Sequence, residues 1–214
     1  MDTAVALVSA YLQVNGYFCV TEYPLLETSE TGDVRTVSDL DILAFRFPGA
    51  GHEVKSRKHK MLIGDTGFEV DPALGARADL PDMIVGEVKR GQARFNSAAR
   101  NPNLLAAGLM RFGCCDPRDA RSLAKSLVTK GVAVNSHGHQ VRMVAFGSVE
   151  PEHELATWHV VSLEKIVSHL EQHLNENWNV LRKVRFSNDA LDLLSLLERT
   201  RQQAAKKRRP QEDI

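Results

Sequence analysis

The spacing of apolar residues predicts a helix followed by three strands in the first part of the chain. Over residues 2–14, apolar side chains recur at the three- and four-residue intervals of an amphipathic helix, and Asn15–Gly16 supplies a stop. Branched and aromatic side chains then indicate strands, the first two of which are separated by a polar turn. These three predicted strands are residues 17–26, 37–47 and 82–89.

Helices dominate the pattern in the rest of the chain, with short strands between them. Asn101–Pro102 resembles a helix cap followed by proline in the first turn, and Gly113 and Gly131 end two successive helices. Ser162 caps a further helix, and a last one begins near Ser187. The strand candidates between these helices are residues 132–134, 140–146 and 158–161.

This order of elements predicts a single α/β domain over residues 1–205, with a mixed central β-sheet flanked by helices. Residues 48–81 contain several glycines and separate the second and third strands, so we interpret them as an insertion, with a small hairpin around 64–66. Residues 150–205 are predicted to add a C-terminal strand, helix and helix. Residues 206–214 form a basic and polar tail.

The composition is that of an ordinary soluble globular protein: 43% of the 214 residues are hydrophobic and 25% are charged, which argues against disordered and fibrous classes. Basic and acidic residues balance at 27 each, so a nucleic acid would have to be held by local basic patches. Three cysteines lack metal-ligand spacing, and neither a secretory signal nor an apolar run of bilayer length is present. We therefore expect a cytoplasmic protein without membrane contact.

Two of the predicted strands carry charges where strands usually have apolar side chains. In the strand over residues 37–47, strict alternation would place Asp39 and Asp41 on one face and Leu40 and Ile42 on the other. The carboxylates would then share one side of the sheet, opposite the side that packs into the core.

The third predicted strand ends in Glu87 and Lys89, whose two-residue spacing puts both side chains on one face. If this strand lies next to the one that carries Asp41, the three charged groups converge. Such a group is costly to bury unless its charge is compensated, and carboxylate oxygens suit Mg²⁺ or Mn²⁺. A metal held by Asp41 and Glu87, with Lys89 beside the phosphate, is the chemistry of phosphodiester hydrolysis. The alternative is a surface ion pair on an edge strand.

The order of a helix, a strand, a strand with an aspartate, a strand ending in Glu-x-Lys, a helix and a further strand resembles the PD-(D/E)XK nuclease superfamily, also called restriction-endonuclease-like. The resemblance implies a restriction-endonuclease-like core and metal-dependent cleavage of nucleic acid. It assigns Asp41 and Glu87 to the metal and Lys89 to catalysis. The literal Pro81–Asp82 pair is set aside, because on one strand Asp82 points away from Glu87.

Many members of that superfamily place a glutamate on the first helix, whereas this helix offers only Asp2 near its start. Glu22, on the following strand, is the nearest substitute, and Gln92 can reach the site, so both are predicted accessory residues. A basic cluster inside the insertion is predicted to contact the nucleic-acid backbone as a flap, with a solvated loop as the alternative. Its residues are Lys55, Arg57, Lys58 and Lys60.

Together these features predict a Mg²⁺- or Mn²⁺-dependent (endo)deoxyribonuclease, acting in DNA repair, restriction or phage defence. Fold does not determine function, so two other functions stay open. A catalytically silent, nuclease-like subunit would bind nucleic acid or support an assembly without cutting. A structural protein would dimerise through the leucine-rich C-terminal helices. The expected partner is nucleic acid, in particular DNA, and a homodimer or a complex with a partner protein is compatible with it.

Overall fold

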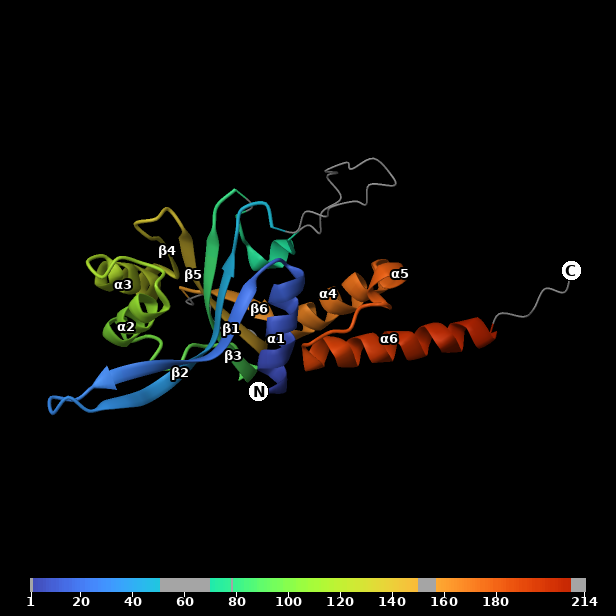
Figure 1. The fold of residues 1–214 in the computed structure, drawn as a ribbon, viewed down its shortest axis with the longest axis horizontal. Helices are drawn as coiled ribbons and strands as arrows, with labels where there is room; N and C mark the ends of the chain where they lie inside the picture. Colours follow the sequence, from blue (N-terminus) through green and yellow to red (C-terminus); the bar gives the residue numbers. More distant parts are fainter. Residues whose placement is uncertain (1, 51–69, 78, 150–156, 209–214) are drawn as a thin grey trace, which may run out of the picture.

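The computed structural model describes residues 2–50, 70–77, 79–149 and 157–208, which form a six-stranded mixed sheet between two groups of helices (Figure 1). Strands β1, β2 and β3 follow one another in the sheet and pair antiparallel. The elements of this first half are helix α1 (Thr3–Val14), strands β1 (Phe18–Thr28), β2 (Val34–Arg46) and β3 (Asp82–Gln92), and the 3₁₀ turn η2 (Pro72–Leu74).

The second half of the chain completes the sheet and adds most of the helices. Strand β5 lies parallel to β3, and its other edge carries β4 antiparallel and β6 parallel. No helix within the described residues is long and apolar enough to cross a membrane. The elements are α2 (Pro102–Phe112), α3 (Ala120–Lys130), β4 (Val132–Val134), β5 (Gln140–Val149), β6 (His159–Ser162), α4 (Leu163–Glu176), α5 (Trp178–Leu181) and α6 (Asp189–Arg208).

Helices cover both faces of the sheet. Helices α2 and α3 pack on one face, and α1, α4 and α6 pack on the other. The central strand β3 is therefore buried continuously from Asp82 to Val88, and burial ends at Lys89, where the strand reaches the edge of the helical layers. The buried apolar residues of these helices include Leu105, Leu109, Leu123 and Leu127 on one side, and Val8, Leu12, Ile166, Leu170 and Leu191 on the other.

The predicted α/β domain with a mixed sheet flanked by helices is confirmed. Several predicted helix ends are confirmed by the hydrogen bonds of their capping residues. The side chains of Asn101 and Ser162 accept backbone N–H bonds at the starts of α2 and α4. The helix that ends at Gly131 is predicted from the sequence to begin at about Pro117, whereas α3 begins at Ala120, because the residues before it form a turn around Asp116. Helix α5 was not predicted, and the hairpin around 64–66 lies outside the described residues.

The aspartate of the literal Pro-Asp pair has a structural role. Asp82 is fully buried and accepts hydrogen bonds from Arg142 Nε at 2.8 Å and Nη2 at 2.7 Å, and from the Tyr17 hydroxyl at 2.6 Å. Arg142 also donates from Nη1 to the carbonyl oxygen of Leu74 at 2.6 Å. These contacts therefore join β3, β5, the residue before β1 and the η2 turn. The Asp82 carboxylate is bound on the face of β3 opposite to Glu87.

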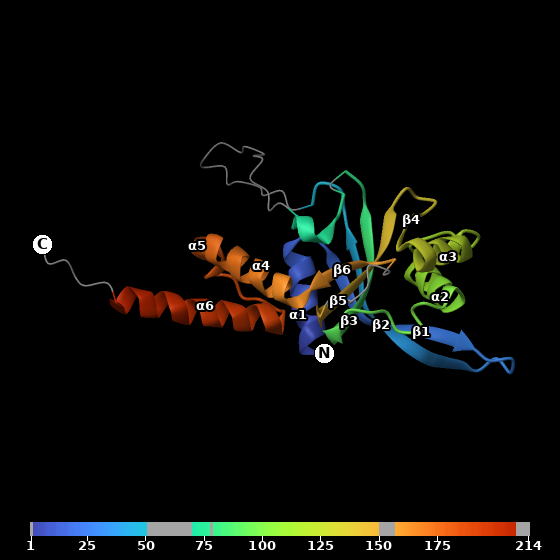
Figure 2. The same cartoon turned by 180° about the vertical axis from the view of Figure 1, so that it is seen from behind.

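Two elements extend beyond the three layers. The β1–β2 hairpin forms a long two-stranded ribbon, and α6 projects in the opposite direction (Figures 1 and 2). The base of the ribbon, where β2 joins the central sheet, is the part of this hairpin that contributes to the candidate site.

Candidate functional site

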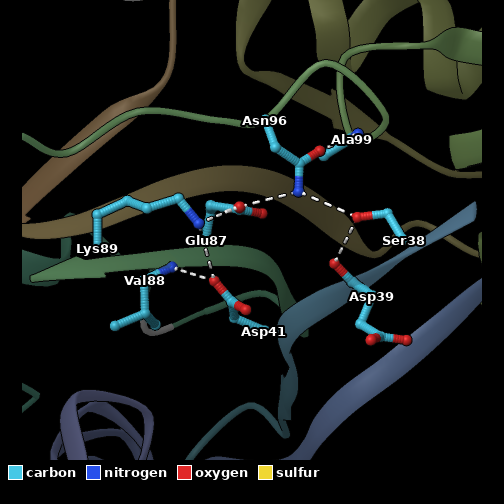
Figure 3. A network of polar contacts seen from close by, with 8 residues as sticks. All are labelled: Ser38, Asp39, Asp41, Glu87, Val88, Lys89, Asn96 and Ala99. Carbon is cyan, nitrogen blue, oxygen red and sulfur yellow. Dashed lines mark hydrogen bonds and ion pairs between the residues drawn. The ribbon is translucent and has the colours of Figure 1, made fainter. Parts of the chain in front are cut away.

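The candidate site lies where β2 separates from β3. The antiparallel pairing of these strands ends with Ile42 opposite Gly86. Just beyond that pair, the backbone N–H of Val88 donates to Oδ2 of Asp41 at 2.7 Å. The Asp41 carboxylate thus accepts the hydrogen bond that a backbone carbonyl would otherwise accept, and so links the two strands. It lies at the point where they separate (Figure 3).

Gly86 allows β2 and β3 to approach closely just before they separate. A Cβ at this position would lie 2.9 Å from Cβ of Ile42 and 3.1 Å from Cε2 of Phe146, which is tighter than a side chain tolerates. The glycine therefore lets β2 and β5 pack closely against β3 at this point. This packing determines the position of Glu87, the next residue.

The three charged side chains predicted to converge do so. Lys89 Nζ donates to Oε1 of Glu87 at 2.5 Å and lies 3.6 Å from Oδ2 of Asp41 (Figure 3). The side chain of Glu87 is 1% exposed, whereas those of Asp41 and Lys89 are 24% and 35% exposed. The Glu87 carboxylate is thus buried, whereas Asp41 and Lys89, which lie beside it, are partly exposed to solvent.

Two residues that sequence reasoning did not single out complete the cluster. Nδ2 of Asn96 donates to Oε1 of Glu87 at 2.9 Å and to Oγ of Ser38 at 3.3 Å. Its Oδ1 accepts from the backbone N–H of Ala99 at 2.8 Å, which holds the amide in place. An asparagine in a polar segment after a strand is typical of any turn, so no signal in the sequence distinguishes this one.

The electrostatics of the cluster oppose ionisation of Glu87 and favour a charged Lys89. Burial raises the pKa of Glu87, and the nearby charge of Asp41 adds to this, against the lowering effect of Lys89 and Asn96. Burial lowers the pKa of Lys89, but the hydrogen bond and charge of Glu87, with the charge of Asp41, outweigh it, so the net pKa is raised. Lys89 is therefore an ammonium at neutral pH and supplies the positive charge between the carboxylates.

The donor set fits a hard divalent cation. Oε2 of Glu87 is buried and has no hydrogen-bond partner among the described residues, and such an oxygen is costly unless a cation or donor reaches it. Asp41 supplies a second carboxylate. Across the described ranges no group of three or more His, Cys, Asp or Glu side chains comes together, so an ion here would take its other ligands from water and substrate, as Mg²⁺ commonly does.

The structure does not bring the two predicted accessory residues into this cluster. Gln92 is exposed, and among the described residues no hydrogen bond joins it to Asp41, Glu87 or Lys89. Glu22 is exposed as well, and in the part of the chain that the structure describes no hydrogen bond joins it to the site. Its backbone is left-handed, with a φ of 55°, an uncommon conformation for glutamate.

The strict alternation predicted around Asp41 is wrong. Leu40 packs in the core under α2 and α3, whereas Ile42 packs in the core on the α1 side. Glu22, whose backbone is left-handed, lies on β1 between the residues that pair with Ile42 and Leu40. The alternation of side chains between the two faces of the sheet is interrupted at this point. As a result the carboxylate of Asp39 points away from Glu87, and only Asp41 joins the site (Figure 3).

The predicted basic flap lies outside the described residues, which stop at 50 and resume at 70. The site geometry above is thus formed by residues other than this flap. Its four predicted phosphate contacts are Lys55, Arg57, Lys58 and Lys60.

A scan against protein-family models, a search of curated proteins and a search of solved structures each found no match for this chain. Function is therefore inferred from the residues of the chain and their geometry.

A stability measurement tests the environment of Glu87. We expect Glu87→Gln to raise the free energy of unfolding at neutral pH in the absence of metal, because the amide keeps the shape of the side chain but removes the buried charge. Because the pKa of Glu87 is raised in the folded state, the folded state binds more protons than the unfolded chain at pH values above 4.5, the ordinary pKa of this carboxyl. The stability of the wild type therefore falls as the pH rises above 4.5. Urea unfolding at a series of pH values measures this.

The gain from Glu87→Gln is expected to be small near pH 4.5 and to grow as pH rises. Glu30→Gln, at an exposed position in the β1–β2 turn, is the control and should change stability little at any pH. A Glu87→Gln protein that is less stable than the wild type by a constant amount at all pH values would show that the Glu87 carboxylate stabilises the fold.

Proposed function

We propose that this chain is a Mg²⁺- or Mn²⁺-dependent nuclease that hydrolyses DNA phosphodiester bonds. The observation that carries the proposal is the meeting of Asp41, Glu87 and Lys89 at the point where β2 leaves β3, with a buried Glu87 oxygen that lacks a partner among the described residues. Two carboxylates and an ammonium are the groups that metal-assisted phosphodiester hydrolysis requires.

The arrangement of elements supports a restriction-endonuclease-like core. Helix α1 is followed by β1, by β2 with Asp41, by β3 with Glu87 and Lys89, by helices α2 and α3, and, after the short β4, by β5 (Figure 1). This is the order on which the resemblance to the PD-(D/E)XK superfamily depends. The tertiary structure adds the adjacency of β2 and β3 that the resemblance assumes.

Each residue of the cluster has a definite part in this proposal. Asp41 and Glu87 would hold the metal, which when bound lowers the pKa of a water ligand and polarises the phosphoryl group. Asn96 orients the Glu87 carboxylate through its bond to Oε1. Lys89 carries a positive charge and is partly exposed, so it stabilises negative charge on the phosphate and does not accept a proton from water.

Metal dependence tests the proposal directly. We expect the purified protein to cut DNA in the presence of Mn²⁺ or Mg²⁺, and EDTA to abolish cutting, because in this proposal the bound metal would lower the pKa of the attacking water and polarise the phosphoryl group. Linear, circular, single-stranded and branched DNA should be compared. Mn²⁺ should also raise the unfolding temperature of the wild type and not that of Glu87→Gln, since a ligand that binds the folded state stabilises it. Cleavage that is unchanged by EDTA contradicts the proposal.

A second candidate function is a catalytically silent subunit that binds nucleic acid. The observation that favours it is the pairing of Lys89 with both carboxylates in a cluster that holds only two acids among the described residues. In that case DNA binding would weaken as salt rises, because phosphate contacts release counterions, while no metal would produce cleavage. Binding and cleavage assays on the same DNA therefore distinguish the two functions.

A further inference from the structure

Helix α6 presents an apolar face that the described part of the protein does not cover. Its inner face packs on α1 and α4, where Leu191, Ser195 and Glu198 are buried. On the opposite side, Leu193, Leu196 and Leu197 are 55%, 58% and 45% exposed. Positions 193, 196, 197, 200 and 204 follow helical spacing, so the three leucines continue into exposed Thr200 and Ala204 as one stripe.

The charges of α6 are divided between its two halves. Residues 189–198 contain the acids Asp189, Asp192 and Glu198 and no base, whereas residues 199–208 contain five bases and no acid. Asp189 and Asp192 are exposed beside the start of the apolar stripe. Arg201 pairs with Glu171 of its own chain at 3.0 Å, and Glu198 is buried on the inner face. The remaining charges of the two halves are opposite in sign, which favours pairing with a second copy that runs in the opposite direction.

We propose that α6 is a dimerisation helix, which pairs antiparallel with α6 of a second copy of this chain. A twofold axis between Leu196 and Leu197 places these leucines against each other and Leu193 opposite Thr200 of the partner subunit. The acidic half of each helix then lies along the basic half of the other, and a parallel pair would bring like charges together. The same surface serves both subunits, as a twofold interface requires.

This interface is separate from the candidate nuclease site. Helix α6 packs outside α1 and α4, on one face of the sheet, and projects from the body (Figures 1 and 2). Glu87 alternates with Met83 and Val85 and so belongs to the other face, under α2 and α3. Dimerisation through α6 leaves the Asp41–Glu87–Lys89 cluster uncovered and does not depend on the proposed function.

Sedimentation equilibrium of the full chain tests the dimer. We expect the wild type to be a dimer and the Leu196→Glu dimer to have a dissociation constant at least about tenfold higher, because each subunit loses a buried apolar side chain and places a charge in the interface. Leu196 is 58% exposed in the single chain, so the variant should keep the wild-type circular dichroism, and its unfolding temperature should equal that of the wild type at concentrations at which both are monomeric. Val134→Glu, at a 63% exposed position on β4, is the matched control and should remain a dimer. A monomeric wild type, or a Leu196→Glu dimer of unchanged affinity, overturns the proposal.

Cysteine cross-linking tests the direction of pairing. Leu193→Cys and Thr200→Cys proteins are oxidised separately and as a mixture, with the wild type reporting any cross-link through its three native cysteines. In the antiparallel pair, residue 193 lies beside residue 200 of the partner and about 10 Å along the axis from residue 193 of the partner. We expect several-fold more cross-linked dimer in the mixture than in either variant alone. If each variant alone forms as much cross-linked dimer as the mixture does, the helices are parallel and the antiparallel arrangement is overturned.

Discussion

Lys89→Ala is expected to lower metal-dependent DNA cleavage by about a hundredfold to a thousandfold, the size of effect seen when one group that stabilises transition-state charge is removed. Lys89 is the only group within the described cluster that carries a positive charge, and its ammonium lies between Asp41 and Glu87. Initial rates with Mn²⁺ on the best DNA substrate measure the loss. Lys130→Ala, at the exposed end of α3, should cut at the wild-type rate.

The same assay distinguishes the proposed metal ligand, Asp41, from Asp39, its neighbour on β2. Asp41→Asn should lose cleavage to a similar extent, because an amide is a weaker ligand for a hard cation. Asp39→Asn is the matched control, since the Asp39 carboxylate points away from Glu87 (Figure 3). Equal activity of the wild type, Lys89→Ala and Asp41→Asn would assign any observed cleavage to a contaminant or to another site.

The second large effect concerns stability. Asp82→Ala is expected to lower the free energy of unfolding by about 3–5 kcal/mol, because it leaves the guanidinium of Arg142 buried without its counter-charge. Arg142 is 6% exposed at its side chain and keeps only the carbonyl of Leu74 as a hydrogen-bond acceptor among the contacts described. Chemical denaturation at neutral pH measures this loss, and the slope of the transition reports whether the folded state stays compact.

A surface ion pair provides the comparison. Arg77 and Asp79 are 2.7 Å apart with side chains 59% and 65% exposed, so Arg77→Ala should leave the denaturation midpoint almost unchanged. Arg142→Met combined with Asp82→Leu should recover part of the loss, since an apolar pair of similar volume carries no desolvation cost. If Asp82→Ala unfolds like the wild type, the buried pair contributes little to stability.

The two aspartates show why a motif in the sequence can mislead. Pro81–Asp82 matches the named motif literally, yet Asp82 is bound to Arg142 in the interior. Asp41 and Glu87 are 46 residues apart and do not form a contiguous motif in the sequence. Asp41 lies in the candidate site because β2 pairs with β3 up to Ile42 and then separates from it. A metal-dependent assay of Asp82 variants that remain folded should therefore show far smaller losses than Asp41→Asn.

The local structure could be predicted from the sequence because its causes are local. The caps at Asn101 and Ser162, the glycine ends of α2 and α3, and the shared face of Glu87 and Lys89 depend on residues a few positions apart. The class of fold followed from the same periodicities. The candidate residues Asp41, Glu87 and Lys89 were therefore visible in the sequence as charges at unusual strand positions.

Only the tertiary structure decided which of these charges meet and in what environment. The end of the β2–β3 ladder at Gly86, the change of facing near Asp41, and the bond from Asn96 to Glu87 depend on contacts between segments distant in the chain. The same is true of the Asp82–Arg142 pair, which spans 60 residues. Periodicity and spacing describe one element at a time, whereas burial and charge compensation arise when elements pack together, so the sequence predicted candidate groups and the fold assembled them into a site.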